Sequence, residues 1–160
     1  MLNLTYRDLN EGDFDVIHSM ASQWDVVRQL GSWPWPSDPA HSLSRCKPYA
    51  GEGFVWAVLL DGAICGSVAV TNTELGYCLE PAFAGRGIMT QAASDAINHA
   101  FATGDITRID AHVWDDNAAL QKVLGKLGFF HWFSAYEYSN VRKMPTLSQS
   151  HRLMRADWTA

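Results

Sequence analysis

"FAGRGIMTQAASDAINHAF", residues 83–101, places two glycines and an arginine in a short turn directly before a one-sided apolar pattern. Apolar pairs recur about every four residues through this stretch, as one face of an α-helix requires. The preceding "TELGYCL" (73–79) is typical of a short strand, so the turn joins a strand to a helix N-terminus. Free N–H groups there favour an anion, and Gly85 and Gly87 would let it approach the backbone closely. The spacing predicts either a phosphate nest or an ordinary strand-to-helix turn.

Composition limits the class of protein. The chain has 160 residues, of which 48% are hydrophobic, and this fits a single domain over 1–160 with a full-sized core. It contains no apolar run near the ~20 residues of a membrane span and no secretory leader, so we expect a soluble, cytoplasmic protein without a membrane partner. A net charge of -5 disfavours nucleic-acid binding and weakly favours a cationic substrate.

The cysteines argue against two kinds of site. Cys46, Cys65 and Cys78 are odd in number and have no C-x-x-C spacing. That pattern disfavours a disulfide framework and a structural zinc site. We therefore expect no metal, and we expect the three cysteines to serve as small buried hydrophobic residues.

The order of predicted elements indicates the fold class. The strongest local signal is Asp61-Gly62, a hairpin turn between two apolar strands. The order is strand, helices, three strands, helix, strand, helix and two strands, which predicts an α/β protein whose mixed sheet carries helices on both faces. Besides the strand 73–79 and the long helix, the predicted elements are a strand at 3–9, a helix capped by Asn10, a short helix at 25–31, a helix at 42–50, strands at 54–60, 63–71 and 106–114, a helix within 115–128, and strands at 129–138 and 149–158 separated by a polar loop.

An ordered set of motifs gives the chain a family resemblance. "ELGYCLEPAFAGRGIMTQA" (74–92) is followed by "ITRIDAHVWDDNAALQKVLGKLGFF" (106–130) and by a final strand ending in "RADW" (155–158). This set resembles the GNAT acyltransferase superfamily and, within it, the RimJ/RimL-type N-acetyltransferases. The resemblance implies the GNAT fold, a mixed and mostly antiparallel sheet with one splayed strand pair.

The resemblance also implies that the turn holds acetyl-CoA. In the family, N–H groups of this turn wrap the pyrophosphate, and the pattern Arg/Gln-x-x-Gly-x-Gly/Ala falls on residues 84–89. Only Gly87 matches strictly, because Ala84 replaces the polar first position and Met89 the small sixth. The pantetheine arm would lie along the strand before the turn, and Asn117, whose other interpretation is a plain helix cap, would contact it. The expected CoA contacts are Tyr77, Cys78, Leu79, Ala84, Gly85, Arg86, Gly87, Ile88, Met89, Thr90 and Asn117.

The resemblance suggests one catalytic residue and leaves a second open. Glu74 occupies a place where many relatives carry a glutamate that deprotonates the amine, although an exposed strand carboxylate is the alternative. The positions at which relatives carry a serine or a tyrosine as proton donor are Leu120 and Leu124, and neither side chain can donate. The proton donor stays unassigned, with Tyr77, Ser94, His131, Tyr136 and Tyr138 as the remaining polar candidates. His112 could line the cleft or be a structural histidine. A further alternative is transfer without a dedicated acid, in which main-chain N–H groups stabilise the thiolate.

The loop "GSWPWPSDPAH" (31–41) lies where the family builds its acceptor site. Trp33 and Trp35, stiffened by neighbouring prolines, would give aromatic walls for a cationic or apolar acceptor, and Asp38 would pair with an amine. The alternative is that the tryptophans cover the core.

The resulting hypothesis is an N-acetyltransferase that moves an acetyl group from acetyl-CoA to a primary amine by direct attack in a ternary complex. The acceptor is a protein N-terminus or a small amine, and the protein is a monomer or a homodimer. One alternative is a CoA-binding module with weak or no turnover, favoured by Ala84, Met89, Leu120 and Leu124. A nucleotide-binding protein with no CoA role is a more distant alternative.

Overall fold

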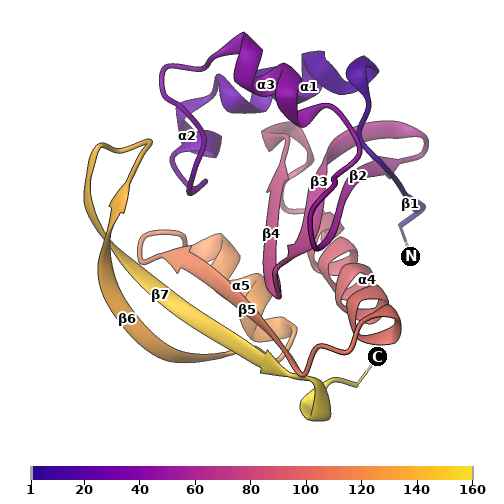
Figure 1. The fold of residues 1–160 in the computed structure, drawn as a ribbon, viewed down its shortest axis with the longest axis vertical. Coiled ribbons are helices and arrows are strands. Elements are labelled where there is room, and N and C mark those ends of the chain that lie inside the picture. The colour runs from indigo at the N-terminus through magenta and orange to yellow at the C-terminus, as the bar shows by residue number, and fades with distance from the viewer. Residues whose placement is uncertain (1, 160) are drawn as a thin grey trace.

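The computed structural model describes residues 2–159 and is built around one twisted seven-stranded sheet (Figure 1). The strand order is β1-β2-β3-β4-β5-β7-β6, and every neighbouring pair is antiparallel except β4 and β5. The strands are β1 (Leu4–Arg7), β2 (Gly53–Leu60), β3 (Ala63–Thr71), β4 (Glu74–Leu79), β5 (Arg108–Trp114), β6 (Phe130–Ser139) and β7 (Met144–Met154). The predicted fold class, a mixed and mostly antiparallel sheet with helices, is confirmed.

Helices cover both faces of the sheet. The α-helices are α1 (Phe14–Ala21), α2 (Trp24–Val27), α3 (Pro39–Arg45), α4 (Ile88–Thr103) and α5 (Ala118–Lys126), and short 3₁₀ turns span Glu11–Asp13, Pro81–Phe83 and Arg155–Asp157. In Figure 1, α1 and α3 cross the top of the molecule, whereas α4 runs beside β2 and β3 and α5 is drawn behind β5. None of the helices described within residues 2–159 is both long enough and apolar enough to cross a membrane.

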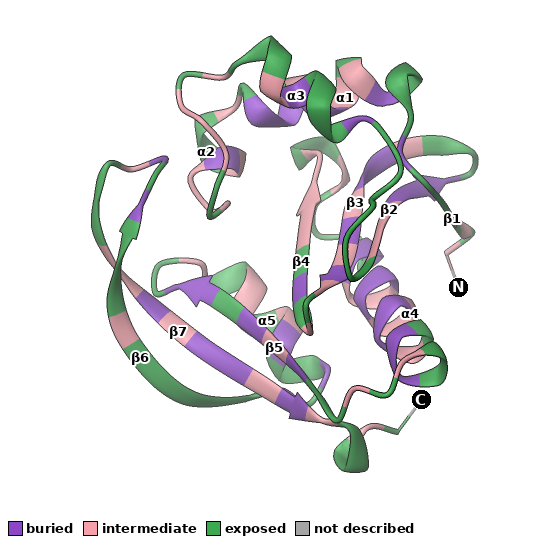
Figure 2. Cartoon of the chain, viewed as in Figure 1, coloured by how far each residue is buried: buried purple, intermediate pink, exposed green. Residues whose placement is uncertain are grey.

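Two apolar clusters follow from this layering. The larger cluster lies under α4 and α5, where Ala92, Ala93 and Ala96 have no exposed surface and so let α4 sit close to the sheet. The smaller one lies under α1 to α3 and includes Met20 and Cys46. Figure 2 shows the purple face of α4 turned inward. Cys46 and Cys65 are buried and Cys78 is half-buried, all three as free thiols.

Turn chemistry explains the parts of the fold that local sequence predicts well. Asp61 and Gly62 both have positive φ, 50° and 85°, as the tight hairpin between β2 and β3 requires. Asn10 caps the 3₁₀ turn that leads into α1, accepting from the N–H of Gly12 at 2.9 Å. The hairpin prediction is confirmed, and Asn10 caps the 3₁₀ turn while α1 itself begins after Asp13 without a side-chain cap.

Three predicted elements are displaced. The short helix expected at 25–31 is α2, which ends at Val27. The helix expected at 42–50 is α3, which begins at Pro39 because the Asp38 side chain caps it by accepting from the N–H of Ala40 at 3.0 Å. It ends before Lys47-Pro48. The loop expected at 139–147 is mostly strand, since β6 and β7 pair as far as Ser139 and Met144, and the predicted last strand ends at Met154.

The parallel pair β4 and β5 separates almost at once. Its only register pair is Glu74 with Asp110, where the N–H of Asp110 donates to the carbonyl of Thr73 at 2.8 Å. Beyond this point β4 stays with β3 and β5 with β7, so the sheet opens into a V (Figure 1). The expected splayed strand pair is therefore present.

Candidate active site in the split of the sheet

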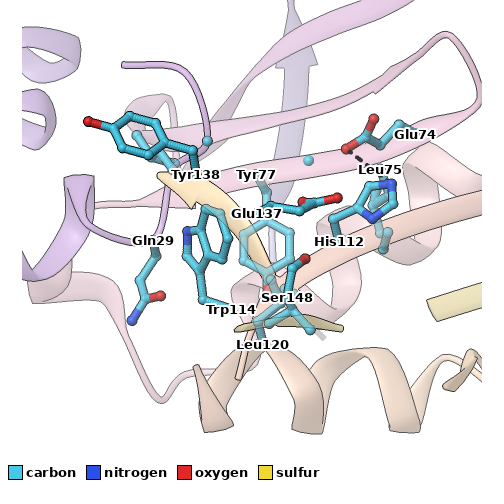
Figure 3. A pocket seen from close by; sticks show the side chains of 15 residues that line it. Gln29, Glu74, Leu75, Tyr77, His112, Trp114, Leu120, Glu137, Tyr138 and Ser148 are labelled. Carbon is cyan, nitrogen blue, oxygen red and sulfur yellow. Dashed lines mark ion pairs between the residues drawn. The ribbon is translucent and has the colours of Figure 1, made fainter. Parts of the chain in front are cut away.

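A cavity of about 310 Å³ occupies the split between β4 and β5. Its walls come from both strands, from the segment after α2, from the start of α5 and from the β6–β7 hairpin (Figure 3). The lining residues are Gln29, Leu30, Gly31, Glu74, Leu75, Gly76, Tyr77, Ala111, His112, Val113, Trp114, Leu120, Glu137, Tyr138 and Ser148.

Glu74, the predicted base, stands at the closed end of the V. Its Oε1 lies 3.9 Å from Nε2 of His112, and the two side chains are 52% and 43% exposed. Figure 3 marks this contact between Glu74 and His112 with a dashed line. The other ring nitrogen of His112 lies 3.0 Å from Oγ of the buried Ser150 on β7. The structure thus places Glu74 in the cavity, where a carboxylate open to solvent and substrate can accept a proton.

The β6 strand adds a second carboxylate that the sequence did not indicate. Glu137 and Tyr138 both line the cavity from β6, opposite Glu74 (Figure 3). The described lining contains two carboxylates and no lysine or arginine. A cavity of this charge attracts an ammonium group.

Arg142, in the β6–β7 turn, holds this wall in place. Its guanidinium makes two bonds to Asp116, at 2.8 and 2.9 Å, and donates to the carbonyl of Arg28 and the side chain of Gln29, both at 3.1 Å. The pKa of Asp116 is lowered, chiefly by these hydrogen bonds from Arg142. One side chain therefore ties together the α2 segment, the β5–α5 loop and the hairpin that frame the cavity.

The edge of β4 facing the V carries unpaired backbone groups. The N–H of Glu80 donates to Cys65 of β3 at 2.8 Å, whereas Thr73 accepts from β5. Backbone groups alternate sides along a strand, so Tyr77 and Leu79 turn their N–H and C=O groups toward β5, where the ladder has already ended. An extended chain with its own amide groups could pair with this edge.

The side chains of Tyr77, Cys78 and Leu79 lie in three different environments. Tyr77 lines the cavity, and burial raises the pKa of its phenol above the ordinary value. The Cys78 thiol lies 3.3 Å from Oγ of Ser67, and burial raises the pKa of this thiol too. Leu79 packs against the larger apolar cluster.

The turn before α4 has the geometry of an anion site. Gly85 and Gly87 both have φ of 76°, and a Cβ placed on either would meet nothing within 4 Å. None of the N–H groups of residues 85–90 donates to an acceptor within residues 2–159; the first that does is Gln91, to the carbonyl of Gly87 at 3.2 Å. The predicted contacts at Gly85, Arg86, Gly87, Ile88, Met89 and Thr90 thus form one run of free donors at a helix N-terminus, whereas the N–H of Ala84 donates to the carbonyl of Pro81 at 3.1 Å.

Two side chains of that turn contact other side chains of the protein. The Arg86 guanidinium lies 5.7 Å from the centre of the Phe83 ring, and Met89 is buried in the larger cluster. Asn117 caps α5, accepting from the N–H of Leu120 at 3.1 Å, so its cap interpretation is confirmed. This bond uses the amide oxygen and leaves the amide nitrogen for another partner.

The predicted acceptor residues are not brought together. Trp33 lines a second and larger cavity, of about 870 Å³, between the sheet and α1 to α3. Trp35 packs on Trp24, with ring centres 5.3 Å apart, and Asp38 caps α3; neither lines either cavity. The expectation for Trp35 and Asp38 thus has no support from the described cavities.

Of the candidate proton donors, three line the first cavity and three do not. Tyr77, His112 and Tyr138 line it. Ser94 lies on α4, Tyr136 is 73% exposed on β6, and His131 bonds to Ser134 at 2.7 Å. Leu124 is completely buried, so it belongs to the core. Among the described residues, no group of three or more His, Cys, Asp or Glu side chains could hold a metal ion.

Residues 3–130 match the family profile described as "Acetyltransferase (GNAT) domain". The chain belongs to this family. The curated protein "Putative ribosomal N-acetyltransferase YdaF" of Bacillus subtilis (strain 168) is 26% identical over 114 residues. That match covers 67% of this chain and 62% of YdaF, so the chain spans less than two thirds of this relative.

Solved structures share the whole fold of this GNAT protein. The ribosomal-protein-S5-alanine acetyltransferase from Vibrio fischeri superposes with a TM-score of 0.78 at 20% identity, covering 100% of this chain and 97% of that one. The spermidine N-acetyltransferase from Vibrio cholerae, solved with CoA and spermine, gives 0.80 at 18% identity and covers 96% of each chain. The two structures differ in acceptor, so the shared fold does not select one.

Proposed function

We propose that this protein is an N-acetyltransferase that transfers the acetyl group of acetyl-CoA to a primary amine in one direct step. The observation that carries the proposal is the split between β4 and β5, which brings a carboxylate, unpaired strand groups and a cavity to one place. Membership of the GNAT family supports the same reaction class.

The residues present fit acetyl-CoA. The free N–H groups of residues 85–90 would hold its pyrophosphate, and the positive φ of Gly85 and Gly87 keeps Cβ atoms away from it. The unpaired edge of β4 at Tyr77 and Leu79 would pair with the amides of the pantetheine arm. Because all these donors belong to the main chain, the substitutions at Ala84 and Met89 leave the site able to bind.

The chemistry assigned to the chain is proton transfer and polarisation. Bound acetyl-CoA supplies the thioester whose acetyl group is transferred. Glu74 takes a proton from the incoming ammonium, directly or through water, so that the neutral amine attacks. Main-chain N–H groups of β4 donate to the thioester carbonyl as negative charge develops on it. The C–N bond forms, the nitrogen releases its second proton to water, and the C–S bond breaks with its electron pair leaving on sulfur.

Tyr77 is the side chain best placed to protonate the departing thiolate. It lines the cavity, and its hydroxyl has no hydrogen-bond partner among residues 2–159, so the O–H is free to donate to the sulfur. Solvent returns the proton to the phenolate afterwards. Tyr77 would thus take the part of the serine or tyrosine that relatives carry at the positions of Leu120 and Leu124.

The rival function is a CoA-binding module without turnover. Leu120 at the cavity wall and the buried Leu124 favour it, because neither can donate a proton. The decisive experiment measures release of free thiol from acetyl-CoA with a panel of primary amines. Amine-dependent release supports the transferase. A melting shift with acetyl-CoA but no release above background would support the binding module, and no melting shift would contradict both.

A further inference from the structure

The second cavity adjoins the first and has the opposite charge. The two share Leu30, Gly31, Gly76 and Tyr77 as lining, so they meet beside the middle of β4. The second extends from there under α1 and α3 (top of Figure 1). Its described lining includes Arg45 and Lys47 and no aspartate or glutamate. The first has two carboxylates and no lysine or arginine, in a chain whose acidic residues outnumber its basic ones by 17 to 12.

The two cations of this cavity lack acidic partners. Within residues 2–159, no carboxylate oxygen lies within 4.0 Å of the Arg45 or Lys47 side-chain nitrogens, whereas Arg7, Arg28, Arg108, Arg142 and Arg152 each have one. The Arg45 guanidinium instead lies 5.4 Å from the centre of the Trp33 ring. A cation on an aromatic wall keeps its charge available to an anionic ligand.

His41 adds an unpartnered polar group to the same wall. Its Nε2 is buried with no hydrogen-bond partner among the described residues, and its ring meets Trp33 edge-on at 5.0 Å. Burial and the Arg45 charge lower the pKa of His41, so the ring is neutral at physiological pH. The charge of this wall therefore comes from Arg45 and Lys47 and not from His41.

We propose that the acceptor is a small molecule carrying both a primary amine and an anionic group, a carboxylate or a phosphate. The inference rests on the proposed transferase function and names its substrate class. The ammonium enters the first cavity beside Glu74 and Glu137, and the anionic group lies in the second beside Arg45 and Lys47. A cavity volume of about 870 Å³ suits a small molecule, since ligand pockets typically span roughly 300–1,000 Å³.

A set of six-carbon amines that differ only at the far end tests the charge preference. The set is 1-aminohexane, 1,6-diaminohexane, 6-aminohexanoate and 6-aminohexyl phosphate, with thiol release as the readout. We expect kcat/KM for the anionic amines to exceed that for the diamine by about tenfold or more, since complementary charge selects the ligand end. The carboxylate and phosphate arms distinguish the two anionic groups, and shorter and longer members report the distance between the sites.

Substitutions locate the preference in the second cavity. Arg45→Gln and Lys47→Gln should each lower the ratio of kcat/KM for 6-aminohexanoate to that for 1-aminohexane about fivefold to tenfold. Lys126→Gln is the matched control, because Lys126 is an exposed cation on α5 that lines neither cavity. It should leave the ratio unchanged. KM for acetyl-CoA should stay constant in all three variants.

Four results would overturn the inference while leaving the transferase intact. The first two are a diamine preferred over both anionic amines and ratios unaffected by Arg45→Gln and Lys47→Gln. The third is a rise in KM for acetyl-CoA instead of for the acceptor, which would assign the cations to CoA. The fourth is a peptide acetylated in preference to every small amine. Failure of the proposed function is distinct, since no amine in the set would then release thiol.

Discussion

Nε2 of His112 on β5 lies 3.9 Å from Oε1 of Glu74 on the adjacent strand β4, at the point where the two strands separate. The imidazole is held from behind by Ser150, whose Oγ lies 3.0 Å from Nδ1. Two groups able to exchange protons therefore stand side by side at the closed end of the cavity. Their roles can be separated by substituting each alone.

Replacing Glu74 with glutamine should slow turnover and leave acetyl-CoA binding intact. The free N–H groups of the turn and of β4 are main-chain, so the substitution does not touch them. Loss of a general base typically costs ~10²- to 10⁴-fold in rate, and raising the pH should recover part of this because more of the amine is already neutral. Rates measured from about pH 6 to about pH 9.5 decide the point. A variant within about threefold of the wild type throughout would leave Glu74 as an exposed strand carboxylate.

Replacing His112 with glutamine should have a smaller effect. If Glu74 takes the proton, His112 only positions its carboxylate, and we expect a loss of about fivefold to tenfold in kcat with little change in KM. Thermal unfolding of the variant controls for the lost bond to Ser150. His112 would be the base instead if its glutamine variant lost as much activity as expected for Glu74→Gln and if its rate recovered at high pH.

Structural features that depend on one short segment of the chain were predicted correctly from the sequence. The Asp61-Gly62 hairpin, the apolar face of α4 and the glycine turn before it all appear where the pattern puts them. Each depends on backbone conformation or on side-chain periodicity within one short segment, which a sequence displays directly.

The sequence fails where distant segments meet. Nothing near Glu137 in the chain indicates that β6 would carry it to the cavity of Glu74, and nothing near Arg142 indicates three loop partners. Asp38 shows the same limit, because a residue suited to binding an amine caps α3 and lines neither cavity. The sequence displays the residue type but not where the fold places its side chain.

The ion pair between Arg7 and Asp13 predicts how stability depends on pH. Asp13 is buried and accepts two bonds from Arg7, both at 2.8 Å, and these bonds are the main cause of its lowered pKa. The stabilisation is fully present above the ordinary carboxyl pKa of about 3.9 and is lost as the pH falls through the lowered value. Asp13→Asn should cost about 2 kcal/mol at neutral pH, and the gap from wild type should close below about pH 4.

Urea unfolding of the Asp13 variant across this pH range tests the prediction. Asp25→Asn is the control, since its pair with Arg28 is long, at 3.7 Å, and its carboxylate is 88% exposed. We expect that control to stay within about 0.5 kcal/mol of wild type. A gap that persists undiminished in acid would assign the effect of Asp13 to packing and not to its charge.

Gly87 and Gly62 offer a matched pair for testing the anion site. Their φ angles are 76° and 85°, and a Cβ on either would meet nothing within 4 Å. Each alanine substitution should therefore cost a similar ~1–2 kcal/mol of stability, from the left-handed conformation alone. Only Gly87→Ala adds its methyl group beside the free N–H groups before α4, in space that a phosphate would occupy.

The response of the two alanine variants to acetyl-CoA separates ligand binding from backbone strain. At ~100 times its dissociation constant, a ligand that binds only the native state adds about 2.7 kcal/mol. Wild type and Gly62→Ala should both show the corresponding rise in melting temperature, and Gly87→Ala should lose most of it. Because the two variants carry the same strain, an equal rise in both would mean that the turn of residues 84–90 does not hold the pyrophosphate. The free N–H groups would then be ordinary helix-end donors exposed to water.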